Sequence, residues 1–254
     1  TNDTSDMLMF NAEEAGIVVK FEKKDTPQKV NIKLFRQGAK DIRLNDTKIS
    51  QKELIGTLNT VIFCPEDLQL IKGTPSGRRR FLDMEISQTS ATYYHQLMQY
   101  NRLLQQRNAV LKEYRGKQNI PLEEWDLQLA DMASFIVKKR LESLKKINLL
   151  IDLMNRKLTG GLENLTIGYE QPYMDNGSLE YTKEGFYERI KAALPQDRHR
   201  LTTSVGPHRD DLRFFSDAMD LKKFGSQGQQ RTAVLSLKLS ELEFIKSEVG
   251  EYPD

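Results

Sequence analysis

The sequence has few of the residues that build disulfides, metal sites and membrane spans. A single cysteine, Cys64, excludes an internal disulfide and suits a reducing compartment, and we expect it to be a small buried residue. The three histidines, His95, His199 and His208, are far apart in the chain and have no metal-ligand spacing. No apolar run approaches the length of a membrane span and no signal segment opens the chain, which predicts a cytoplasmic protein without a membrane partner.

Neither positive nor negative charge predominates in the sequence. The 254 residues include 38 Lys and Arg against 36 Asp and Glu, a formal net charge of +2, which excludes a uniformly basic nucleic-acid coat. Any contact with DNA must therefore come from local basic patches. The length is sufficient to bury a core and to form one large or two ordinary domains.

The N-terminal part of the chain has the pattern of a small antiparallel sheet. Apolar residues alternate with polar ones over residues 16–46, and polar or glycine-containing turns separate the alternating stretches. Ser50 and Glu53 have the spacing of a capping box, which predicts a short helix ending by Gly56. The apolar run at residues 60–63 is typical of a buried strand.

The middle of the chain has helical periodicity. One helix is expected from Gly77 to about Glu113, and a second after Pro121, ending at Gly160-Gly161. Because a short loop joins them, the two helices should pack antiparallel as a helical hairpin. Further on, residues 165–169 and 212–214 are predicted strands, and residues 185–194 a short helix.

The segment Ser226-Gln227-Gly228-Gln229 is a polar loop that leads directly into an amphipathic helix. The first turn of a helix has unpaired N–H groups and its dipole favours an anion, so the Ser226 hydroxyl and the Gly228 amide could bind a phosphate. An ordinary Ser-Gly helix cap is the alternative from these local features. The apolar stripe expected for the helix is Leu235, Leu239, Leu242, Ile245 and Val249.

This loop resembles the signature loop of the ABC-type ATPases, with Gln227 in place of the commonest glycine. Residues 226–232 are similar to the form found in the RecF family of bacterial recombination mediators. Two more segments resemble motifs of that family: Phe63-Cys64-Pro65-Glu66-Asp67-Leu68 followed by Lys72-Gly73 and Arg78-Arg79-Arg80-Phe81-Leu82-Asp83, and Gly206-Pro207-His208-Arg209-Asp210-Asp211-Leu212. Three motifs in family order argue against a chance match.

The resemblance implies an α/β fold, as part of an ABC-type (P-loop NTPase) ATPase head with an inserted long helical hairpin arm. Residues 1–76 would be part of the head, with the small sheet and the buried strand. Residues 77–200 would be the inserted arm domain, and residues 201–254 the return to the head with the signature loop and its helix.

Two parts of such a head are missing from the sequence. There is no Walker A P-loop, G-x-x-x-x-G-K-[ST], whose amides and lysine hold phosphates. There is also no Walker B pattern, an apolar strand ending in acids that position Mg²⁺ and the attacking water. We therefore expect these residues to be the middle of a longer protein and to be inactive in hydrolysis by themselves, with no catalytic residue and no metal ligand of their own.

The resemblance also implies a site shared between two subunits. In the ABC family the signature loop closes over ATP held by a partner, so Ser226, Gln227, Gly228 and Gln229 are implied to contact the partner's ATP, with its Mg²⁺, in a homodimer formed on ATP binding. The implied function is DNA repair and recombination: binding of single- and double-stranded DNA at gaps to promote recombinase loading, with the companion mediators RecO and RecR.

Basic residues of the arm are candidate DNA contacts: Arg78, Arg79, Arg80, Lys138 and Lys139. Alternatively, Arg79 and Arg80 pair with Asp83 or Glu85, and the lysines are a solvated helix face.

Several alternatives remain at this stage. Residues 64–68 lie where related heads carry a sensor of the γ-phosphate, or they simply begin a helix. Residues 208–211 are interpreted as a structural ion-pair turn rather than a catalytic group. The whole chain could instead be the head of another SMC-like chromosome-maintenance ATPase, or a non-enzymatic helical scaffold for DNA repair.

Overall fold

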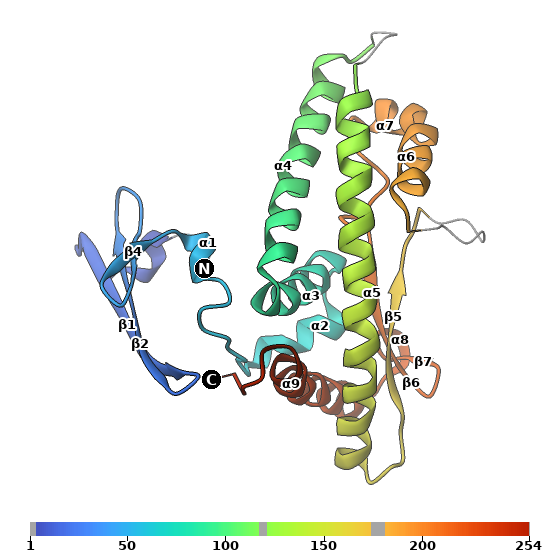
Figure 1. The fold of residues 1–254 in the computed structure, drawn as a ribbon. Helices are drawn as coiled ribbons and strands as arrows, with labels where there is room; N and C mark the ends of the chain where they lie inside the picture. Colours follow the sequence, from blue (N-terminus) through green and yellow to red (C-terminus); the bar gives the residue numbers. More distant parts are fainter. Residues whose placement is uncertain (1–3, 117–120, 174–180, 254) are drawn as a thin grey trace. The chain divides into compact units, whose positions relative to one another are not determined.

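The computed structural model describes residues 4–116, 121–173 and 181–253. These residues form two compact units, Thr1–Thr60 with Pro253–Asp254 and Val61–Tyr252. Figure 1 shows the elements of both units coloured along the chain.

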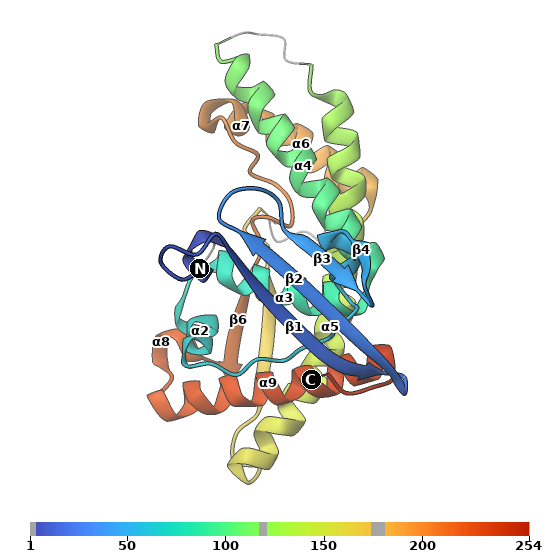
Figure 2. The same cartoon turned by 90° about the vertical axis from the view of Figure 1, so that its left-hand side faces the viewer.

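The first unit is built on an antiparallel sheet with the strand order β1-β2-β3-β4, drawn in blue in Figure 2. Its turns are tight because Lys24 with Asp25, and Asn45 with Asp46, adopt positive φ, as two-residue hairpin loops require. The predicted sheet is therefore confirmed, and a fourth strand extends it. The elements are η1 (Thr4–Met7), β1 (Glu14–Lys23), β2 (Thr26–Phe35), β3 (Asp41–Leu44), β4 (Thr47–Ile49) and α1 (Gln51–Leu54). The predicted capping box at Ser50 begins α1.

The second unit is mostly helical and contains an antiparallel sheet of the order β5-β6-β7. The strands predicted near residues 165–169 and 212–214 are confirmed as β5 and β6. Its elements are η2 (Pro65–Leu68), α2 (Gln69–Lys72), α3 (Pro75–Thr89), α4 (Ala91–Glu113), α5 (Glu123–Thr159), β5 (Leu165–Glu170), α6 (Lys183–Ala192), α7 (Leu194–Arg200), β6 (Asp211–Ser216), β7 (Met219–Asp220), α8 (Leu221–Phe224) and α9 (Gln227–Val249).

The long helix α5 is the centre of this unit. It packs against α4, α6, β5 and α9, and Figure 1 shows α4 and α6 lying along it. Apolar residues spaced by three and four line its buried face, including Val137, Leu144, Ile147 and Ile151. The prediction of a long second helix is confirmed, and Gly160 ends it in the left-handed conformation, at φ 66°.

The prediction of one continuous helix from Gly77 to Glu113 is wrong. Ser90 is extended, with φ −142° and ψ 98°, and separates α3 from α4. Its hydroxyl accepts a hydrogen bond from the Tyr93 amide at 3.2 Å, so Ser90 caps a new helix. Apolar periodicity continues across the break, which is why the sequence pattern did not reveal it.

Residues 60–63 do not form the predicted buried strand. Ile62 and Phe63 are 69% and 51% exposed, and Cys64 is exposed rather than buried. The Cys64 Sγ lies 3.3 Å from Asp67 Oδ1, and this carboxylate raises the pKa of the thiol. The segment continues into η2, so the helix start predicted at residues 64–68 is confirmed, and a sensor of the γ-phosphate there stays a prediction.

The buried face of α9 matches the predicted stripe only in part, since Ile245 is buried as expected. Ala233, Leu237 and Ser240 are buried, whereas Leu235 is 41% exposed. Small residues on this face allow α5 and α9 to approach, and the Ser236 hydroxyl donates to Asn155 Oδ1 of α5 at 3.1 Å. Alanine and serine thus contribute to the buried face of α9 beside its large apolar residues, and the spacing of large apolar residues alone does not indicate that contribution.

Candidate functional site

The backbone of the loop between α8 and α9 is held in place by a close contact at Gly225 and by a hydrogen bond from α9. At Gly225 a Cβ atom would lie 2.7 Å from the Leu221 carbonyl oxygen, so a side chain does not fit there. The same carbonyl accepts a hydrogen bond from Gln230 Nε2 at 2.7 Å. The close turn at Gly225 therefore fixes the direction in which α9 begins.

Ser226 is the N-cap residue of α9 and forms a capping box with Gln229. The Ser226 hydroxyl accepts from the Gln229 amide at 3.2 Å, and Gln229 Oε1 accepts from the Ser226 amide at 2.9 Å. Gln229 Nε2 also donates to Glu163 Oε1 at 3.0 Å. The Ser226 oxygen is therefore an acceptor within the cap, and its hydroxyl hydrogen remains available as a donor to a ligand.

Gly228 lies in the first turn of α9 with open space beside it. Ser226, Gln227 and Gly228 are all exposed. A Cβ atom at Gly228 would meet only the Ser226 hydroxyl, at an ordinary 3.8 Å, so no described neighbour requires glycine here. Glycine in a helix costs about 1 kcal/mol relative to alanine, and the first-turn amides at this position face outward.

Basic side chains lie beside the same helix start. Lys222, Lys223 and Arg231 are exposed and flank the loop, and Lys222 Nζ donates to the Gly73 carbonyl at 2.9 Å. These cations add to the positive end of the helix dipole. The loop is therefore suited to an anion approaching from solvent.

The arginines of the predicted DNA contact lie in three different environments. Arg78 is 3% exposed; its guanidinium contacts both carboxylate oxygens of Asp211, at 2.7 and 2.8 Å, and the Gly73 carbonyl at 2.9 Å. Arg79 is half-buried and donates to the Asp210 carbonyl at 2.7 Å, whereas Arg80 is exposed. Among the described residues, neither Arg79 nor Arg80 forms the alternative ion pair with Asp83 or Glu85.

The lysines of the same prediction lie on α5. Lys138 is exposed, and Lys139 forms a 3.5 Å ion pair with Glu142 one turn further on. Arg80 and Lys138 therefore present their charge to solvent, whereas Arg78 acts inside the fold.

The residues 208–211 belong to a buried polar network. Arg140 of α5 donates to the Pro207 carbonyl at 2.8 Å and lies 3.6 Å from Asp210 Oδ2, which also accepts from the Tyr169 hydroxyl. Burial raises the pKa of Asp210 to about 6, against the opposing effect of Arg140. The network joins α5 to the loop that precedes β6.

His208 is neutral within this network. Burial lowers its pKa to about 4. Its Nε2 lies 3.0 Å from the Thr203 carbonyl and must carry the hydrogen there, so Nδ1 accepts from the Tyr100 hydroxyl at 2.6 Å. Both imidazole nitrogens are thus occupied by structural contacts.

Sequence reasoning missed Arg140 as the centre of this network. A usable signal was present, because Arg140 falls between Val137 and Leu144 on the apolar face of α5. A buried charge on an apolar face needs a partner of opposite charge. That partner is supplied by segments distant in the sequence.

The described residues offer no metal site and no membrane span. Groups of three or more His, Cys, Asp or Glu side chains able to hold a metal ion are absent from the described segments. Among the helices of those segments, none combines the length and apolar character that crossing a membrane requires.

Comparison with known proteins gives a consistent result. No protein-family profile matches the chain. The DNA replication and repair protein RecF of Alkaliphilus oremlandii is 44% identical over 256 residues, covering 100% of this chain and 70% of the relative. The protein of the same description from Halothermothrix orenii is 40% identical over 260 residues, covering 100% of this chain and 69% of the relative.

Solved structures agree with these relatives. The structure of the recombination mediator protein RecF-ATP in the RecFOR pathway matches 99% of this chain and 69% of its own, with 33% identity and a TM-score of 0.92. A second structure, RecF-ATPrS, matches with a TM-score of 0.91 and 34% identity. The predicted fold class, part of an ABC-type ATPase head with an inserted helical hairpin, is confirmed, and the chain belongs to the RecF family of DNA replication and repair proteins.

Proposed function

We propose that the start of α9 closes over the ATP of a second subunit. Ser226 would donate its hydroxyl to a phosphate oxygen, Gly228 its amide, and Gln227 and Gln229 would line the approach. The observation that carries the proposal is Gly228: it is exposed, it is in a helix, and none of the described residues beside it requires the absence of a side chain. A close approach of this helix start to a phosphate would leave no room for a side chain and would explain the glycine.

The electrostatics of the loop support an anionic ligand. The positive end of α9 is flanked by Lys222, Lys223 and Arg231, and phosphate oxygens are favoured by both the unpaired amides and these cations. The carboxylate of Glu163 is nearby, but it already accepts hydrogen bonds from Gln229 Nε2 and the Ser216 hydroxyl. In this arrangement Mg²⁺ would be held on the partner's side of the nucleotide.

The wider function follows from the family. We propose ATP-dependent homodimerisation, binding of single- and double-stranded DNA at gaps, and promotion of recombinase loading together with RecO and RecR. The relative of known structure is described as a recombination mediator with ATP in the RecFOR pathway, which supports this reading. Arg80 and Lys138, which are exposed, are the proposed DNA contacts, with Lys139 and Arg79 beside them. Arg78 would position Asp211.

The functional division of the chain is also a proposal. Residues 1–76 and 201–254 would serve the nucleotide-binding head, and residues 77–200 the arm. In the second unit, η2 and α2 contact α9, and α2 contacts α8, which supports assigning residues 65–72 to the same part as the signature loop.

The test uses a chimera in which this chain replaces the matched segment of the Alkaliphilus relative, so that a full-length protein is studied. Ser226→Arg in the chimera should leave ATP binding by the monomer nearly unchanged and abolish the ATP-dependent dimer, because the arginine fills the space of the partner's phosphate. Fluorescent ATP binding and light scattering measure the two properties separately.

Thr232→Arg is the matched control, since it adds the same charge further along α9. It should dimerise with ATP as the parent does. A normal ATP-dependent dimer for Ser226→Arg would reject the proposal, and a chimera that never dimerises with ATP would favour the non-enzymatic scaffold.

A further inference from the structure

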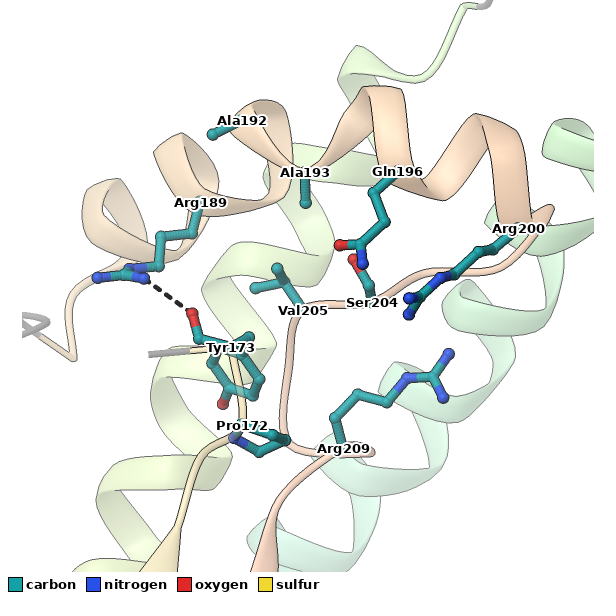
Figure 3. A pocket seen from close by; sticks show the side chains of 10 residues that line it. All are labelled: Pro172, Tyr173, Arg189, Ala192, Ala193, Gln196, Arg200, Ser204, Val205 and Arg209. Carbon is teal, nitrogen blue, oxygen red and sulfur yellow. Dashed lines mark hydrogen bonds between the residues drawn. The ribbon is translucent and has the colours of Figure 1, made fainter. Parts of the chain in front are cut away.

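A cavity of about 470 Å³ lies between α6, α7 and the loop before β6, and none of the described residues that line it belongs to the signature loop. Figure 3 shows its wall, which includes Tyr173, Arg189, Gln196, Arg200, Ser204 and Arg209. Three of the lining residues are arginines, and none of the described lining residues is acidic. Its volume is in the range of small-ligand sites, roughly 300–1,000 Å³.

Arg209 is held in place before any ligand arrives. Its Nε and Nη2 donate to the Thr203 carbonyl at 3.0 and 2.7 Å, and Nη2 also lies 3.2 Å from the Thr202 hydroxyl. These bonds use one edge of the guanidinium. A fixed guanidinium binds an oxyanion without losing much side-chain entropy.

Arg200, the last residue of α7, points toward Arg209 across the cavity (Figure 3). Two guanidinium groups that face one another repel, and an anion between them removes that repulsion. The nearby carboxylate cannot do so, because Asp197 is buried and accepts from Arg107 Nη1 at 2.7 Å and from the Ser204 hydroxyl at 2.6 Å. The position between the two arginines is therefore suited to an external anion.

The other side of the cavity is apolar. Tyr173, Pro172 and the buried Val205 form a wall beside the arginines (Figure 3). The Tyr173 carbonyl accepts from Arg189 Nη1 at 2.8 Å, and its hydroxyl accepts from Gln171 Nε2 at 2.9 Å. Burial raises the pKa of the Tyr173 hydroxyl, so the ring stays neutral and can contact a flat apolar group.

We propose that this cavity binds a nucleoside phosphate, with the phosphate between Arg200 and Arg209 and the sugar or base against Tyr173 and Pro172. A phosphate carries more charge than a carboxylate and accepts from two guanidinium groups at once, which fits the paired arginines. The ligand is either a free mononucleotide or the phosphorylated end of a nucleic-acid strand. The cavity is separate from the signature loop, and the proposal does not depend on the function proposed for that loop.

The experiment measures binding of deoxyadenosine 5′-monophosphate to the chain by calorimetry. Arg200→Gln should weaken binding roughly tenfold or more, because a charge-assisted contact is lost. Arg200→Glu should abolish it. Arg156→Gln changes an exposed arginine of α5 outside the cavity and should bind as the parent does. Because Arg200 is exposed, its variants should keep the unfolding temperature of the parent.

Three further ligands complete the test. Deoxyadenosine, which lacks the phosphate, should not bind detectably. A 5′-phosphorylated oligonucleotide that competes with the mononucleotide identifies a strand end as the ligand, whereas competition by mononucleotide alone identifies the free form, and both support the site. The proposal would be overturned if Arg200→Gln bound the mononucleotide as tightly as the parent does. It would also be overturned if the parent bound deoxyadenosine as tightly as the mononucleotide, or an acidic peptide more tightly.

Discussion

Arg140 of α5 and Asp83 of α3 form a two-pronged ion pair, with Nε 2.9 Å from Oδ1 and Nη2 3.0 Å from Oδ2. The arginine side chain is 2% exposed and the aspartate 17%. The Tyr93 hydroxyl also donates to Asp83 Oδ1, at 2.5 Å. The ion pair joins α3 to α5, and the Tyr93 hydrogen bond joins α4 to α3 across the break at Ser90.

Replacing Arg140 by methionine should destabilise the protein by about 3–5 kcal/mol, because Asp83 and the buried Asp210 would lose their cation. Urea unfolding followed by circular dichroism gives the free energy of unfolding. Lys139→Met is the control, since its pair with Glu142 is exposed and worth about 0–1 kcal/mol. Equal effects of the two substitutions would contradict the structural role assigned to Arg140.

Gly228→Ala should leave the free energy of unfolding equal or higher while it weakens ATP-dependent dimerisation. The open space at this position accepts a methyl group, and alanine favours the helix by up to about 1 kcal/mol, so the free energy of unfolding should stay equal or rise. In the chimera, the same methyl group should impede approach to the partner's ATP and weaken the ATP-dependent dimer. Urea unfolding and light scattering report the two effects, and a variant that is more stable and dimerises normally would count against the proposed contact.

Gly206→Ala should have the opposite effect on stability. Gly206 has φ +130°, and a Cβ atom there would overlap the hydroxyl of Tyr100, which is itself buried against His208. We expect a loss of about 2–4 kcal/mol from strain and overpacking. Gly77→Ala, at an open position near the start of α3, is the control and should be neutral or stabilising. The midpoint of thermal unfolding distinguishes the two, and a neutral Gly206→Ala would show that the loop can rearrange.

The pair Glu85 and Glu241 should make stability depend on pH. Both carboxyl groups are buried on facing helices, and burial is the main cause that raises the pKa of each above its ordinary value of 4.5. Lys238 Nζ lies 2.7 Å from Glu241 Oε2 and opposes the shift, whereas Asp67 adds to it. Among the described residues, Glu85 Oε2 and Glu241 Oε1 have no hydrogen-bond partner.

A raised pKa means that the folded protein keeps a proton that the unfolded chain has lost. Unfolding then releases a proton, so the free energy of unfolding falls as the pH rises from about 4.5 through the folded pKa. Glu241→Gln removes one of these acids and should be more stable than the parent at alkaline pH by about 1 kcal/mol or more, with a smaller difference at pH 5. Urea unfolding at a series of pH values measures this, and parallel profiles for variant and parent would show that Glu241 is ionised in the folded protein.

The local elements of this chain were largely predictable. Alternation predicted the first sheet, a Ser-Glu spacing predicted the cap at Ser50, and Gly160 was expected to end the long helix. The signature loop was also recognisable, because its chemistry lies in consecutive residues from Ser226 to Gln229. The apolar periodicity did not predict the break between α3 and α4, because the pattern continues across Ser90.

The sequence by itself determined the family, the helices and strands of these regions and the position of the signature loop, since each depends on residues close together in the chain. Only the tertiary structure decided which charges face solvent. Arg78 and Arg80 have the same charge and are two positions apart, yet Arg78 is buried against Asp211 and Arg80 is exposed. Tyr173 and Arg209 line one cavity although they are far apart in the sequence, because the antiparallel pairing of β5 with β6 places the segment after β5 beside the loop before β6.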